Sequence, residues 1–142
     1  MQHVENTKSV TKIEAADITT ATTHQHSIDT LGFGHASVDV VFEPVAAAGT
    51  NSAVAIALKL QEGDTTSSYS DITAFVGGGT GGFTVPTPGN TTDTNVVRFD
   101  VDLRGRKRYL NVYATPQAAA VSTINVRVSN GEHVVDSAAD KV

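Results

Sequence analysis

Hydrophobic residues recur at every second position in several short segments of this chain. In 97–103 apolar side chains alternate with charged ones, and 36–42 and 122–129 show the same period of two. That period is typical of a β-strand with one buried face. The predicted strands are 36–42, 52–61, 71–76, 83–85, 97–103, 109–113 and 122–129, with weaker strand signals at 9–14 and 133–135. The pattern therefore predicts an all-β chain.

Two of these segments need further argument. Residues 52–61 are rich in Ala and Leu, which favour a helix, but the strict alternation favours a strand. Residues 97–103 are followed by the basic run 104–108 and then by the strand that starts at Tyr109. We interpret this unit as a β-hairpin whose tip carries four of the ten Lys and Arg residues.

The segments between the strands are rich in Gly, Pro, Ser, Thr and Asn, as expected of turns. About seven or eight strands separated by such turns predict an antiparallel β-sandwich or jelly roll. We expect residues 28–142 to form this single domain. Residues 1–27 are polar and threonine-rich, and we interpret them as an extended N-terminal arm with at most one edge strand; terminal disorder is the alternative.

The composition narrows the functional classes. A net charge of −5 opposes binding to nucleic acid or to an anionic membrane. With no cysteine, disulfides and thiolate metal sites are excluded. The polar N-terminus has no signal-peptide pattern, and no segment is apolar enough to span a membrane, so we expect a protein that is made and assembled in a cytoplasm.

Motifs for catalysis or cofactors are weak. The glycine run 77–82 lacks the lysine of a phosphate loop, and we expect a mobile loop that orders against a neighbour. His24 and His26 would share one face of a strand and could bind a metal with His35, but solvated histidines on a surface arm are the favoured interpretation. The sequence neither identifies nor excludes a carboxylate pair for glycoside hydrolysis, because the two members of such a pair come together only in the folded protein. We expect no enzyme and no cofactor.

The basic run is the strongest local signal for binding. Its residues are Arg104, Arg106, Lys107 and Arg108. Four cations this close repel one another unless a partner, or nearby carboxylates such as Asp100 and Asp102, offset the repulsion. A solvated turn that deters aggregation is the alternative. An acidic protein partner is favoured over DNA because the chain itself is acidic. His24 and His26, on the expected arm, are the other partner-binding candidates.

Four segments together resemble the head-decoration, or capsid cement, proteins of tailed bacteriophages. The order and spacing of these segments carry the resemblance. The four segments are Asp29-Thr30-Leu31-Gly32-Phe33, Leu58-Lys59-Leu60-Gln61-Glu62-Gly63-Asp64, Ser70-Asp71-Ile72-Thr73 and Arg98-Phe99-Asp100-Val101-Asp102-Leu103-Arg104-Gly105-Arg106-Lys107-Arg108-Tyr109-Leu110.

The resemblance implies a β-sandwich on the outer surface of a virion capsid. There it would bind the major capsid protein, bridge neighbouring subunits and stabilise the head, often as a homotrimer or a dimer, with no direct contact to nucleic acid or membrane. A virion-surface module that attaches to a host or to glycans is the alternative function. The missing Trp and the few Tyr weigh against that alternative, because sugar binding usually uses an aromatic platform.

Overall fold

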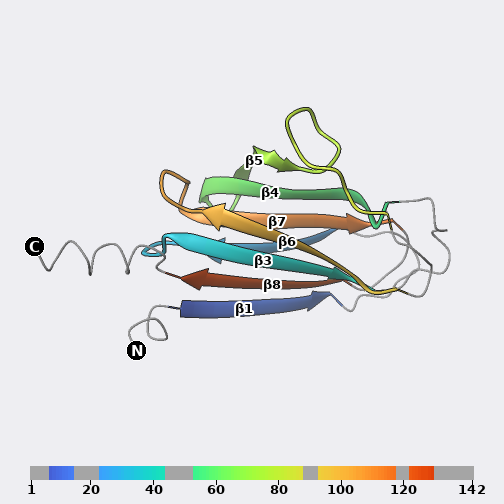
Figure 1. Cartoon of the computed structure of the whole chain (residues 1–142). Coiled ribbons are helices and arrows are strands. Elements are labelled where there is room, and N and C mark those ends of the chain that lie inside the picture. Colours follow the sequence, from blue (N-terminus) through green and yellow to red (C-terminus); the bar gives the residue numbers. More distant parts are fainter. Residues whose placement is uncertain (1–6, 15–22, 44–52, 88–92, 118–121, 130–142) are drawn as a thin grey trace, which may run out of the picture.

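Eight strands form two four-stranded antiparallel sheets that pack face to face. The computed structural model describes residues 7–14, 23–43, 53–87, 93–117 and 122–129. Its strands are β1 (Thr7–Glu14), β2 (His24–Asp29), β3 (His35–Phe42), β4 (Ala55–Thr65), β5 (Ser68–Val76), β6 (Asn95–Asp102), β7 (Tyr109–Pro116) and β8 (Ser122–Ser129). The first sheet has the order β1-β8-β3-β6 and the second β2-β7-β4-β5 (Figure 1). The predicted all-β sandwich is confirmed.

The chain changes sheet at almost every connection, which is the double-sheet arrangement of a jelly roll. The hairpin β4–β5 is the only connection between consecutive described strands that stays within one sheet. None of the described residues is helical, so this part of the chain holds no helix that could cross a membrane.

The core lies between the sheets and follows from the period-2 pattern. In β3 the inward residues Ala36, Val38, Val40 and Phe42 are buried and alternate with half-buried outward ones. Val38 lies in register between Phe99 of β6 and Val126 of β8, so one buried layer crosses three strands. Burying such a row of apolar side chains is the dominant favourable term in folding.

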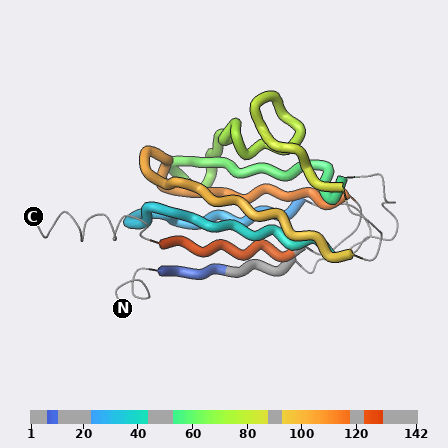
Figure 2. Tube along the Cα trace, viewed as in Figure 1, coloured from blue at the N-terminus to red at the C-terminus, as the bar shows by residue number. Residues whose placement is uncertain are grey.

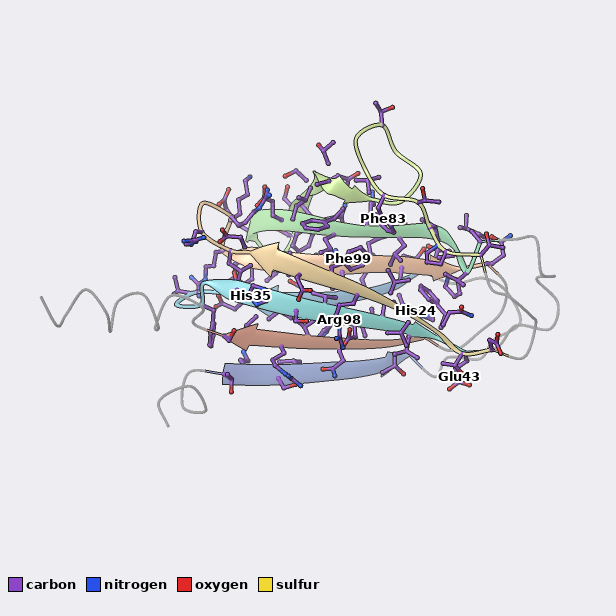
Figure 3. All side chains as sticks on the ribbon, viewed as in Figure 1. His24, His35, Glu43, Phe83, Arg98 and Phe99 are labelled. Carbon is purple, nitrogen blue, oxygen red and sulfur yellow. The ribbon has the colours of Figure 1, made fainter. Side chains whose placement is uncertain are left out.

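Three phenylalanines close the open side of the sandwich between β5 and β6. The ring of Phe99 packs edge-to-face against Phe75 at 5.8 Å and against Phe83 at 5.1 Å, measured between ring centroids. Phe83 follows the glycine run, and Figure 3 shows it directly above Phe99. Edge-to-face pairs at this separation are favourable because the ring edge is positive and the ring face negative.

The glycine run forms a compact turn against β4 and β5. Gly77 donates to the carbonyl of Leu58, and Phe83 and Gly79 both donate to the carbonyl of Val76. A β-carbon on Gly82 would overlap the carbonyl oxygen of Val76, so this approach requires glycine. The predicted strand 83–85 is reduced to a single bridge between Phe83 and Gly77.

Other predictions have mixed outcomes. Residues 55–61 of the predicted strand 52–61 lie in β4, which continues to Thr65, so the strand was correctly preferred over the helix. The predicted edge strand 133–135 lies outside the described residues. Within the expected arm, β1 is an edge of the first sheet and β2 is an edge of the second. The pattern did not predict β2, because two of its inward positions are histidines.

The predicted hairpin 97–113 is wrong. Strand β6 pairs with β3 in the first sheet, whereas β7 pairs with β2 and β4 in the second. The connection 103–108, here called the tip loop, therefore crosses from one sheet to the other. Six residues span the roughly 10 Å between packed sheets easily, and alternation alone does not distinguish the two pairings.

Candidate contact surface at one end of the sandwich

The tip loop lies at one end of the sandwich, beside the turn 30–34 and the loop of the β4–β5 hairpin. Figure 2 shows these three connections at the left end of the sandwich. We call this end of the molecule the tip end.

Backbone hydrogen bonds fix the tip loop against the turn 30–34. The carbonyl oxygen of Arg108 accepts from the Thr30 amide at 2.9 Å and from the Thr30 hydroxyl at 2.7 Å. Leu103 donates to the carbonyl of Gly34 at 2.9 Å. The buried side chain of Leu103 anchors the start of the loop in the core. The loop is consequently held at both ends.

Each of the four predicted cations forms an ion pair with a carboxylate of this chain. The shortest nitrogen–oxygen distances are 2.7 Å for Arg104–Asp102, 3.5 Å for Arg106–Glu62, 3.1 Å for Lys107–Asp64 and 2.7 Å for Arg108–Asp29. Three of these carboxylates come from β2 and β4, which are distant in sequence. The expected repulsion among the cations is thus balanced within the fold. Asp102 contributes as expected, whereas Asp100 lies 3.9 Å from His35.

Hydrogen bonds from arginine keep two of these carboxylates ionised. The Arg108 side chain, and then the backbone amide of Leu31, lower the pKa of Asp29 to about 2. The side chain and backbone amide of Arg104 likewise lower the pKa of Asp102 to about 2. Both carboxylates are therefore charged at any ordinary pH.

One large apolar side chain is exposed at the tip end. Leu31, in the turn that follows β2, is 68% exposed. Two other large apolar residues of the described chain are similarly exposed, Ile56 at 61% and Val96 at 56%. Both lie at the beginning of their strands, at the opposite end of the sandwich. Leu31 is thus an exposed apolar side chain beside the Asp29–Arg108 ion pair.

The histidines do not lie where the sequence placed them. His24 is 3% exposed and lies opposite Ala114 in β7, and His26 lies opposite Val112. Both therefore share a face, as predicted, but it is the inner face of the second sheet and not a solvated arm. His35 lies on the outer side of the first sheet, at the other end of the sandwich from His24 (Figure 3). In the described part of the chain, no three metal-binding side chains come together.

The outer face of the second sheet carries a feature that the sequence reasoning missed. All three tyrosines of the protein, Tyr69, Tyr109 and Tyr113, are half-buried on this face. The exposed Gln25, the half-buried Gln61 and the buried Asn111 lie there with them. We call this surface the tyrosine face. The spacing of Tyr109 and Tyr113 in one strand was a usable signal, since both positions share a face. Nothing in the sequence placed Tyr69 beside them.

The outer face of the first sheet is charged instead. Arg98 donates twice to Asp39, at 2.6 and 3.0 Å, and this bidentate pair borders a polar hollow with Ser37, Asn125 and Arg127. The hydrogen bonds from Arg98 lower the pKa of Asp39. The two outer faces of the sandwich therefore differ in chemistry.

The fold brings together the segments that carry the resemblance to decoration proteins. Asp29 belongs to the first segment, Glu62 and Asp64 to the second, and the tip loop to the last, and they form the ion pairs of the tip end. The remaining segment, 70–73, lies on β5, where Asp71 pairs with Lys59 at 2.9 Å. Residues separated by up to 79 positions thus form one connected surface.

No protein-family description and no curated protein sequence matches this chain. Among solved structures, the SPBc2 prophage-derived protein YomS is similar, with 14% identity and a TM-score of 0.44 over 87% of this chain and 95% of that chain. A family 35 carbohydrate binding module from Clostridium thermocellum has 13% identity and a TM-score of 0.40 over 87% of this chain and 93% of that chain. A protein from Bacillus endospore appendages has 14% identity and a TM-score of 0.31 over 87% and 86%.

Proposed function

We propose that this protein is a structural virion protein that binds the outer surface of an assembled phage capsid. It stabilises the head by bridging subunits of the major capsid protein, and the tip end is the surface that makes the contact. The observation that carries the proposal is that parts of three of the four segments that resemble decoration proteins meet at the tip end. Residues that serve only to fold a sandwich need not gather in this way.

The tip end has the properties that a contact surface needs. Its loops are fixed by the hydrogen bonds from Thr30 and Leu103, so little conformational entropy is lost on binding. Leu31 supplies an apolar anchor, and the charges around it resemble the polar rim of a protein interface.

The charges of the tip end also favour a specific partner. The side chains of Arg104 and Arg108 are 63% and 48% exposed although both are paired. Such cations can add a further hydrogen bond to an acidic group of the capsid without giving up their own carboxylates. Their long-range field would mainly affect the association rate and the specificity.

A protein that binds only the assembled capsid stabilises it by mass action. We propose the outer capsid surface as its location and assembly in the host cytoplasm. We further propose a homo-oligomer, with a trimer favoured over a dimer, and neither a catalytic activity nor a cofactor. Sedimentation of the isolated protein would test the oligomeric state.

The test uses phage particles that lack this protein, to which purified protein is added. Bound protein is measured by co-sedimentation, and the temperature of DNA release is measured with a dye. Wild-type protein should bind and raise the release temperature. Leu31→Thr should weaken binding about tenfold, because burying a leucine contributes about 1.5 kcal/mol or more.

Ile56→Thr and Val96→Thr are matched controls, because they make the same kind of change at similarly exposed positions of the opposite end. They should bind like wild type. The double variant Arg106→Ala with Arg108→Ala should weaken binding and flatten its salt dependence. Equal release temperatures with and without the protein would refute the function. Equal loss of binding in all three threonine variants would refute only the assignment of the tip end.

A further inference from the structure

We propose that the tyrosine face is a carbohydrate-binding surface for a neutral oligosaccharide. This activity goes beyond capsid binding and uses a different surface, which meets the tip end only at the Arg108–Asp29 ion pair. The tip end lies at one end of the sandwich, whereas the tyrosine face runs along β7 on the outer side of the second sheet. A protein bound through its tip end could therefore present this face to solvent.

The three tyrosines lie along β7 on the outer side of the second sheet, from its first residue to its middle. Tyr109 and Tyr113 are four residues apart in β7, about 13 Å at the usual rise of a strand. Between them, Tyr69 of β5 reaches across the sheet and its hydroxyl donates to Ser27 of β2 at 2.5 Å. Its ring lies on Gly63, where a β-carbon would be 2.9 Å from the ring carbon Cδ1. Tyr69 therefore lies flat on the sheet.

Such a row of rings fits the apolar faces of sugar rings. The C–H groups on one side of a pyranose carry partial positive charge and stack on the negative face of an aromatic ring. Lys59 lies 5.0 Å from the ring centre of Tyr113, and Arg108 lies 5.1 Å from that of Tyr109. Each cation lies over one face of its ring, and stacking on a sugar requires only the other face.

Side-chain amides lie between the rings and suit hydroxyl groups. Asn111 is buried and donates to Gln25 at 3.2 Å and to Gln61 at 2.9 Å. Gln61 in turn donates to Asp71 at 2.7 Å. This connected row holds the two glutamine amides in fixed orientations before any ligand arrives. An amide offers both a donor and an acceptor, as a pair of neighbouring sugar hydroxyls requires.

The charges on this face favour a neutral ligand. Lys59 is paired with Asp71, and Arg108 with Asp29. The local charge is therefore balanced, unlike a surface that selects phosphate, sulfate or an acidic peptide. Rings and amides are what remain for recognition, and a neutral oligosaccharide is the class of ligand that uses both.

The tyrosines of the unmodified protein can serve as a fluorescent probe of binding. It has no tryptophan, and its three tyrosines all lie on this face, so tyrosine fluorescence reports on this surface alone. The isolated protein is first screened on an array of neutral and charged glycans. The neutral oligosaccharides that bind are then titrated into the protein while its tyrosine fluorescence is followed. We expect saturable binding of at least one neutral oligosaccharide and a change in fluorescence.

Tyr113→Ala and Tyr69→Ala should each weaken that binding about tenfold, whereas Tyr113→Phe and Tyr69→Phe, which keep the rings, should stay within about threefold. The alanine variants should still bind capsids, which separates this proposal from the proposed function. No binding on the array, binding restricted to charged glycans, or equal affinity of alanine and phenylalanine variants would overturn it. So would an oligomer in which the tyrosines are shielded from iodide quenching, because a second copy of the chain would then cover the face.

Discussion

Replacing Asn111 with aspartate should destabilise this protein in a way that depends on pH. The Asn111 side chain is 1% exposed, and its amide nitrogen donates to one oxygen of Gln25 and one oxygen of Gln61. Aspartate has nearly the same shape but no donor when it is ionised. The substitution therefore sets a buried carboxylate against two carbonyl oxygens.

The two hydrogen bonds set the expected magnitude. Asn111→Ala removes both, at about 1 kcal/mol each, so the free energy of unfolding should fall by about 2 kcal/mol. Asn111→Asp adds a buried and uncompensated charge, so its loss should reach about 4 kcal/mol near pH 7. For a chain of this length, about 3 °C of Tm per kcal/mol gives decreases of about 6 °C and about 12 °C.

The pH dependence follows from the pKa of the new carboxyl group. Burial and the two facing oxygens raise this pKa in the folded state above its ordinary value of about 3.9. Between the unfolded and folded pKa values the native state binds more protons than the unfolded state, so the variant loses stability as the pH rises through that interval. Below about pH 4 the protonated carboxyl can donate to one glutamine oxygen, and most of the extra loss should disappear.

Urea unfolding of wild type and both variants, followed by far-UV circular dichroism at about pH 4 and about pH 7, measures these differences. The alanine variant should show the same deficit at both pH values, and the aspartate variant a larger one near pH 7 only. Identical behaviour of the two variants at both pH values would refute the buried, doubly bonded position of Asn111.

Two further predictions concern the glycine run and the tip end. Gly82→Ala should lower the free energy of unfolding by about 3 kcal/mol because the new β-carbon overlaps backbone. Gly78 has a φ of 72°, which strains alanine, but its surroundings are open, so Gly78→Ala should lower the free energy of unfolding by about 1 kcal/mol. Equal losses of the two variants in urea unfolding would contradict this account. Asp29 and Asp102 have folded pKa values of about 2 against an ordinary 3.8, so their stabilisation is complete above about pH 4 and is lost as the pH falls toward 2. Arg108→Gln should raise the pKa of Asp29 toward 3.8 and leave the pKa of Asp102 unchanged. NMR titration of the carboxyl carbons measures both pKa values. An Asp29 pKa that stays near 2 in the variant would show that Arg108 is not the main partner of Asp29.

The candidate site could be predicted in part. The basic run identified the residues of the tip loop, because cations that are neighbours in the chain can be recognised from the sequence alone. Their partners Asp29, Glu62 and Asp64 were not predicted, since two crossings between sheets bring them together. The tyrosine face was missed because its members come from four strands, and a count of three tyrosines says nothing of whether they meet.

The sequence by itself determined the strands and the inward side of most of them. In 36–42 and 97–103 the alternation is a local property, imposed by the period of two of an extended backbone. Only the tertiary structure decided which strands pair, because a strand with one apolar face can bury it equally well in a hairpin or across the sandwich. For the same reason His24 and His26 were assigned to solvent, although the register of β2 on β7 directs both toward the core. Pairing depends on contacts between distant residues, and no local pattern contains that information.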